Sequence, residues 1–190
     1  MTVDEIFRDL TAHAIQGMMA HDQFANYYDF LGLNGYKRCH EYHFMRETCS
    51  YRKLCRYFVS HYNKLVPYKE VDDPEVIPNS WYNYKRQDVD ATTKKNAVKS
   101  ALSKWIEWEM STKRLYESMY KELMELGEVA SACFVKELIE DVSCELKKAE
   151  GYMLNKSTTG FDLSDIIADQ KHKHHKYKAK MKKDFRGMVC

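Results

Sequence analysis

The sequence predicts an all-α protein, a four-helix bundle in which one connection is long. Only three prolines and seven glycines occur in 190 residues, whereas strand-rich folds need frequent turns. These residues gather at a few places and leave four long segments without a helix breaker. Within each segment apolar residues recur at alternating steps of three and four, which is the spacing of one helix face. A length of 190 residues with 44% hydrophobic content is enough for one core, so we expect one compact domain.

The first two helices are expected at about Val3 to Phe30 and about Gly35 to Lys64. The segment between them is short and carries Gly32, a residue that ends helices readily. A short joint forces two consecutive helices to run antiparallel as neighbours. The sequence therefore predicts a helical hairpin in its first third.

The third and fourth helices are expected at about Asp90 to Leu126 and about Glu128 to Leu154. Asp88 or Asp90 is a suitable N-terminal cap for the third helix, and Gly127 separates it from the fourth. This joint is again short. A second antiparallel hairpin is expected.

The connection between the hairpins, from about Leu65 to Val89, contains all three prolines of the chain. A helix of 28 residues is ~42 Å long, and an extended chain covers that distance in about 13 residues. The connection can therefore cross the whole bundle. A simple up-down bundle would instead use three short loops.

After the fourth helix, Phe161 to Asp169 is expected to form a short fifth helix, which would complete a bundle domain at residues 1–170. The remaining 20 residues, 171–190, include the run KHKHHKYKAKMKK. Residues 171–186 carry a net charge of +7, which leaves −5 for the rest of the chain. Composition favours a disordered, solvated tail. The alternatives are weak metal capture by His172, His174 and His175, or contact with a polyanion such as nucleic acid.

Neither end of the sequence indicates export or membrane insertion. Met1 to Leu10 carries Asp4, Glu5 and Asp9 where a signal peptide would be basic and then apolar, and no stretch approaches 18 uninterrupted apolar residues. The six cysteines form no C-x-x-C pair and no zinc-ribbon spacing. We expect a cytoplasmic protein without membrane contact.

Four glutamates fall near the middle of the core-facing seams, namely Glu47, Glu109, Glu137 and Glu140. Unpaired charge inside a bundle costs several kcal/mol in effective terms, so something should compensate these carboxylates. A carboxylate-bridged metal pair is one answer. The other is that the glutamates lie at the surface or pair with lysine and arginine.

Two segments resemble ferritins of the bacterial type. Residues 27–36 (YYDFLGLNGY) resemble the end of the first ferritin helix and its following turn, and residues 134–141 (FVKELIED) resemble the metal-binding segment of the fourth. With the long crossover, the resemblance covers roughly residues 3–170. It implies a homo-oligomeric shell that binds iron and can oxidise and store it.

The ferritin ligand pattern is matched only in part. Glu47, Glu109, Glu137 and Glu140 correspond to the family's carboxylates on the second, third and fourth helices. Ala14 stands where the family has a glutamate, and Ser50 stands where it has a histidine. The resemblance therefore implies a degenerate di-iron centre, and whether the chain is an enzyme stays open.

A displaced site is a further hypothesis. In an antiparallel hairpin that turns at residues 31–34, His21 lies opposite residues 40–43. His43 and Glu47 are four residues apart on one helix face, a spacing used by helical metal sites. His21, His43 and Glu47 are thus candidate ligands for zinc or Fe(II). Alternatively His21, His40 and His43 form hydrogen bonds in a polar core.

Three functions follow from these observations. The first is a ferritin-like protein that binds iron and oxidises or stores it. The second is a bundle that has lost the metal and serves as a scaffold or binding protein, which the residues Ala14 and Ser50 favour. The third is a mononuclear or di-metal oxidase of another kind, with Tyr36, Tyr51, Tyr57 and Tyr116 as redox neighbours.

Overall fold

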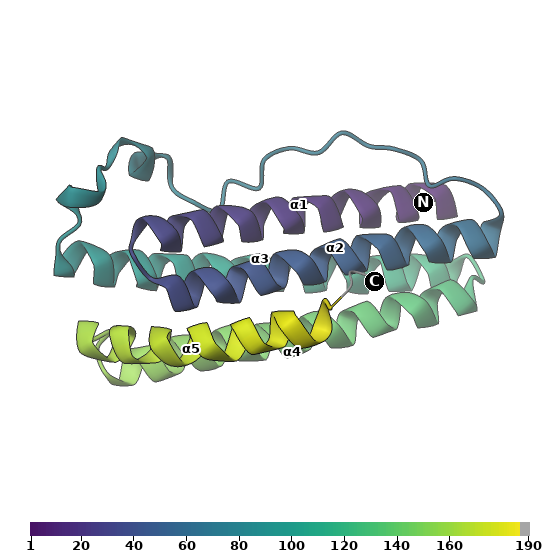
Figure 1. The fold of residues 1–190 in the computed structure, drawn as a ribbon. Helices are drawn as coiled ribbons and strands as arrows, with labels where there is room; N and C mark the ends of the chain where they lie inside the picture. Colours follow the sequence, from purple (N-terminus) through teal and green to yellow (C-terminus); the bar gives the residue numbers. More distant parts are fainter. Residues whose placement is uncertain (187–190) are drawn as a thin grey trace.

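The computed structural model describes residues 1–186 and is all-helical over that range (Figure 1). Its five α-helices are α1 (Val3–Phe30), α2 (Asn34–Tyr62), α3 (Ala91–Glu125), α4 (Val129–Thr158) and α5 (Leu163–Asp184). The predicted four-helix bundle is confirmed, and the predicted ends of the first four helices agree within four residues. None of the helices in this range is both long enough and apolar enough to cross a membrane.

Local capping explains where the first hairpin starts and turns. The Thr2 hydroxyl accepts a hydrogen bond from the Glu5 amide, and the Glu5 carboxylate accepts one from the Thr2 amide, which together form a capping box. At the other end Gly32 adopts a positive φ of 71°, where a Cβ would be strained. The Leu33 amide then donates to the Tyr28 carbonyl at 2.8 Å and closes the turn into α2.

The connection between α2 and α3 lies along α1, as Figure 1 shows. The Lys69 ammonium contacts Asp9 at 3.1 Å, and the Val76 amide donates to the Gln23 side chain at 3.3 Å. Two short 3-10 helices, η1 (Asn79–Asn83) and η2 (Arg86–Asp88), follow before α3 begins. Asp90 caps α3 by accepting from the Thr93 amide. The predicted crossover is confirmed.

The prediction for the end of the chain is wrong for residues 171–184. These residues continue α5 rather than forming a disordered tail, and a boundary at residue 170 would fall inside this helix. The reason is that the lysine-rich run has helical periodicity with one apolar side, where Ile166 and Tyr177 are buried. Residues 187–190 of the predicted tail lie outside the described residues.

The core consists of two apolar clusters with a polar layer between them. One cluster surrounds Tyr28 and Trp105, and the other surrounds Phe7 and Leu123. Between the clusters, the inward positions carry mainly histidine, glutamate and threonine. Burial of apolar area on both sides at about 25 cal/mol per Å² stabilises the bundle around a layer that is expensive to bury.

A candidate metal site in the middle of the bundle

A cavity of about 30 Å³ lies in the polar layer, between α2, α3 and α4. This volume is enough to hold a water molecule or a small ion. The cavity combines four carboxylates with an arginine, an imidazole and three hydroxyl groups. Its lining residues are His43, Arg46, Glu47, Ser50, Glu109, Thr112, Tyr116, Leu138, Asp141, Val142 and Glu145.

Glu47 and Glu109 are brought together, as the sequence predicts. Both line the cavity, and Glu109 is only 5% exposed. The Trp105 indole N–H donates to Glu109 Oε1 at 2.8 Å, whereas Glu47 has no hydrogen bond or ion pair within residues 1–186. On the α1 side, a Cβ added to Gly17 would lie 3.1 Å from Glu47 Cγ and Oε2. Gly17 therefore makes the space that the Glu47 side chain occupies.

Burial changes the protonation of both acids. Desolvation raises the pKa of Glu109 to about 8, and the neighbouring Glu47 carboxylate adds to the effect against the Trp105 hydrogen bond. Desolvation also raises the pKa of Glu47 to about 7, with Arg46 opposing and Glu145 and Asp141 adding. At neutral pH the pair therefore holds protons that exposed glutamates would release.

The opposite side of the cavity already contains its own cations. The Arg46 guanidinium makes a close ion pair with Glu145, and its Nη2 lies 3.4 Å from Asp141 Oδ1. Lys148 adds a contact to Glu145 Oε1 at 2.7 Å. The cavity thus has a neutralised half at Glu145 and an uncompensated half at Glu47 and Glu109.

Three buried histidines lie next to the acid pair. His21 and His40 share a hydrogen bond between their Nδ1 atoms at 3.1 Å, and the rings of His21 and His43 are 5.2 Å apart. His21 Nε2 lies 3.8 Å from Glu109 Oε1, and His43 Nδ1 lies 3.3 Å from Glu145 Oε2. Desolvation lowers the pKa of His21 to about 3, so this imidazole is neutral.

This arrangement confirms the expected pairing across the first hairpin and supports the alternative of a hydrogen-bonded polar core for His21 and His40. It also leaves two polar atoms of the cavity lining without a hydrogen-bond partner within the described range, and one of them is Glu145 Oε2. The other is the buried His43 Nε2.

The expectation that Glu137 and Glu140 join the site is wrong. Both side chains are exposed on α4 and neither lines the cavity. The helix turns its Leu138, Val142 and Glu145 face inward instead, because this face supplies the apolar contacts to the core. Since Glu145 follows Val142 by three residues, the same apolar seam carried a signal for Glu145 that the sequence prediction missed.

The two positions at which the sequence lacks a ferritin ligand are Ala14 and Ser50. Ala14 is fully buried in the Phe7 cluster, so α1 offers no carboxylate there, and Ser50 lines the cavity where a histidine was expected. Of the four tyrosines considered as redox neighbours, Tyr116 lines the cavity. Within residues 1–186 no three His, Cys, Asp or Glu side chains are arranged closely enough to hold a metal as a preformed group. The set His21, His43 and Glu47 therefore stays a hypothesis.

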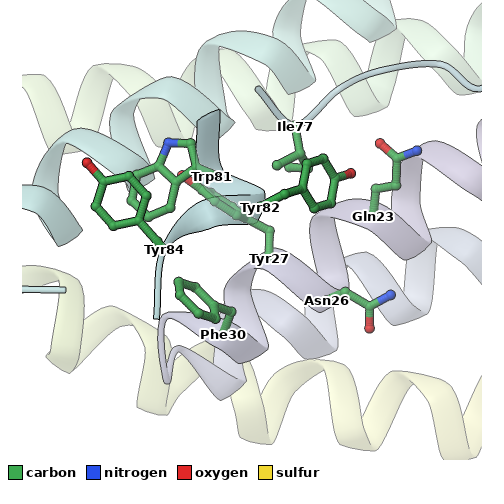
Figure 2. A pocket seen from close by; sticks show the side chains of 8 residues that line it. All are labelled: Gln23, Asn26, Tyr27, Phe30, Ile77, Trp81, Tyr82 and Tyr84. Atoms are coloured by element: carbon green, nitrogen blue, oxygen red, sulfur yellow. The ribbon is translucent and has the colours of Figure 1, made fainter. Parts of the chain in front are cut away.

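A larger cavity, of about 310 Å³, lies between α1 and η1 (Figure 2). Aromatic rings dominate its walls. The ring centres of Tyr27 and Trp81 are 5.1 Å apart in an edge-to-face arrangement, and those of Trp81 and Tyr84 are 4.8 Å apart in a stack. Gln23 and Asn26 supply its amide groups. The lining includes no carboxylate, imidazole or thiol, so it does not suit a metal ion.

The fold matches that of ferritins. An engineered closed form of the Archaeoglobus fulgidus ferritin superposes with a TM-score of 0.75 and 15% identity, over 92% of this chain and 96% of the ferritin. A humanized archaeal ferritin gives a TM-score of 0.74 and 15% identity, over 90% of this chain and 94% of the ferritin. The open-pore ferritin of the same archaeon superposes with a TM-score of 0.73 and 16% identity, over 90% of this chain and 93% of the ferritin. No family model and no curated protein matches the sequence.

Proposed function

We propose that this ferritin-fold protein binds iron at a single-cation site between Glu47 and Glu109. The observation that carries the proposal is a buried Glu109 beside a partly buried Glu47, neither of which forms an ion pair with Lys or Arg among the described residues, at a space for one small ion. Two carboxylates and one divalent cation together are neutral, which removes the cost of burying the acids. The likeness to ferritins supports iron as the cation, and carboxylate and imidazole donors suit Fe(II). Zinc is the alternative metal.

The donor set fits one metal ion and does not fit two. Glu47 and Glu109 line the cavity, and so does His43, whose Nε2 has no hydrogen-bond partner among the described residues. Arg46 and Lys148 both contact Glu145 Oε1, so a second cation at Glu145 Oε2, which has no hydrogen-bond partner within residues 1–186, would face two positive charges. The Arg46 guanidinium thus supplies the positive charge that a second metal ion would bring to Glu145 and Asp141.

Iron bound at this site is the substrate to be stored and not a resident cofactor. In ferritin-type sites the bound Fe(II) is oxidised by dioxygen. A complete di-iron oxidase is not supported by these residues. We therefore infer slow oxidation rather than rapid turnover, in a homo-oligomer in which iron is held or stored. The exposed Tyr82 and Tyr84 at the α1–η1 cavity are consistent with contact between subunits.

The test is anaerobic titration with Fe(II), and with Co(II) as a spectroscopic probe, by calorimetry and absorbance. Wild type is expected to bind about one ion per chain, and Glu47→Gln or Glu109→Gln is expected to weaken binding by about 100-fold, because each removes a charged ligand. Glu137→Gln and Glu140→Gln are matched controls on exposed positions and should bind as wild type does. Equal loss in the controls, or no binding to wild type, contradicts the proposal.

Arg46→Met tests the limit to one ion. Removing the guanidinium leaves Glu145 and Asp141 with less positive charge, so a second ion of lower affinity is expected to bind. A stoichiometry that stays at one refutes the role given to Arg46 and leaves the Glu47–Glu109 site standing.

A scaffold without metal is the second candidate function. It is favoured by the lack of a preformed three-ligand group within residues 1–186 and by the protons that the acids retain near pH 7. Size measurement in solution, made together with aerobic Fe(II) oxidation followed optically, separates the two. An oligomer that neither binds nor oxidises iron supports the scaffold.

A further inference from the structure

Helix α5 presents a continuous basic face to solvent. The exposed lysine, arginine and histidine side chains between residues 171 and 186 fall on one side, within roughly half of a helix circumference at 3.6 residues per turn. Ala179 is exposed among them, and the acid Asp184 is exposed on the opposite side. We name these eight residues the basic face: Lys171, His172, His175, Lys176, Lys178, Lys182, Lys183 and Arg186.

The fold fixes this face in place. On the other side of α5, Lys173 is 2% exposed and Tyr177 is also 2% exposed. The Lys173 ammonium contacts Asp169 Oδ2 at 2.5 Å and lies 3.6 Å from the centre of the Tyr152 ring. Asp184, the one acid between residues 171 and 186, accepts a hydrogen bond from the Tyr42 hydroxyl at 2.9 Å. The anchoring contacts therefore take up the acid and leave the cations of the basic face outward.

The charges of the basic face are not neutralised by the protein. None of its lysines or its arginine forms an ion pair with another of the described residues. The helical part of the face, from Lys171 to Lys183, extends over ~18 Å, since 12 residues separate its ends at a rise of ~1.5 Å each, and Arg186 follows just after the helix end at Asp184. A rigid row of cations of this length is complementary to the phosphates of a polyanion.

We propose that the basic face binds the phosphate backbone of double-stranded DNA without sequence preference. Six of the eight side chains of the face are lysine or arginine and none is Phe, Tyr or Trp; its rings are the imidazoles of His172 and His175. This composition favours contact with backbone phosphates over stacking on unpaired bases. The face also carries no large apolar side chain to insert below lipid headgroups, which disfavours a membrane surface. Backbone phosphates need only fixed cations, and an ordered helix holds these with less entropy loss than a tail would.

The experiment measures binding of the full chain to a fluorescent 20-base-pair duplex by anisotropy, over a series of salt concentrations. The test variant is Lys171→Gln/Lys178→Gln/Lys182→Gln, which removes three cations from one line of the face. Its affinity is expected to fall at least 10-fold at 0.15 M salt, and the slope of log K against log salt is expected to drop by about 2 to 3. The control Lys121→Gln/Lys136→Gln/Lys147→Gln changes the net charge equally on exposed positions outside α5 and should bind within about 3-fold of wild type.

Several outcomes overturn the proposal. They are no duplex binding by wild type at 0.05 M salt, an equal loss of affinity in the control, or an unchanged salt slope in the test variant. Tighter binding to a single-stranded oligonucleotide, or to vesicles that contain anionic lipid, overturns it in favour of those partners. Helical circular dichroism confirms that the variants are folded, and the wild-type salt series stands even where a variant is not. None of these outcomes depends on metal binding at Glu47 and Glu109.

Discussion

Two regions of this bundle bury charged side chains, and they differ in whether the chain supplies the opposite charge. At the α5 interface, Asp169 accepts from the Tyr36 hydroxyl at 2.8 Å and contacts both Lys173 and Lys156. In the central cavity, Glu47 has no such partner within residues 1–186. The first arrangement holds a helix in place, and the second is stable only when a proton or a cation is present.

Protonation reflects the same difference. Burial alone would raise the pKa of Asp169, but the charge and hydrogen bond of Lys173, the Tyr36 hydrogen bond and the Lys156 charge together lower it. Desolvation lowers the pKa of Lys173 despite this partner, so the pair is held at some cost. Glu47 and Glu109 instead have raised pKa values of about 7 and about 8. An acid that is paired stays charged, and an acid that is buried without a partner keeps its proton.

The largest expected effect comes from breaking the paired region. Asp169→Asn leaves the Lys173 ammonium buried without a counterion, which should lower the free energy of unfolding by about 3 kcal/mol. Urea denaturation followed by circular dichroism measures this loss. The double variant Asp169→Asn/Lys173→Met removes both charges and should recover more than half of it. A double variant as unstable as the single one would show that the ion pair is not what holds α5.

The second effect comes from removing an unpaired acid. Because the folded-state pKa of Glu109 is about 8 against 4.5 for an exposed glutamate, the folded protein binds more protons between these values and loses stability as pH rises through them. In the presence of a chelator, Glu109→Gln is therefore expected to be more stable than wild type at pH 8, by about 2 kcal/mol, and nearly equal at pH 4.5. Thermal unfolding at the two pH values tests the sign. A variant less stable than wild type at pH 8 contradicts the raised pKa.

The third effect is the pH dependence of metal affinity. Binding of a cation must displace the protons held by Glu47 and Glu109, so affinity should rise with pH between about 6 and 8, by up to about 10-fold per unit for each proton released. Calorimetry in buffers of different ionisation enthalpy counts these protons directly. An affinity that is flat over this range would mean that the metal binds elsewhere.

The smallest effect concerns the space beside Glu47. A Cβ at Gly17 would approach Glu47 Cγ and Oε2 to 3.1 Å and displace the carboxylate by a few tenths of an ångström. Gly17→Ala should weaken metal binding by about 1 kcal/mol, since ligand position controls affinity. Gly151→Ala is the matched control, because a Cβ there meets nothing within 4 Å, and it should stabilise α4 by about 0.5–1 kcal/mol. Equal metal affinity in the two variants would remove any role for Gly17 in shaping the site.

The sequence by itself determined the four long helices, both hairpins and the crossover, because helical periodicity and Pro/Gly punctuation are local signals. It placed Glu47 and Glu109 on the seams of their helices, as it did Glu137 and Glu140, and left open which of these acids lie inside the bundle. The pairing of His21 with His40 also followed, since a short turn fixes the register of an antiparallel hairpin.

Tertiary structure alone decided which of several acids on α4 turns inward and where the last helix lies. Glu137, Glu140 and Glu145 are all compatible with a helix, and packing of Leu138 and Val142 against the core selected Glu145. The run after residue 170 is too charged to be stable as an isolated helix, and its burial of Lys173 depends on Asp169, Tyr152 and Tyr36. Local patterns make both outcomes possible, since the run has helical periodicity and Glu145 continues an apolar seam, but contacts between residues far apart in the chain select them over the alternatives.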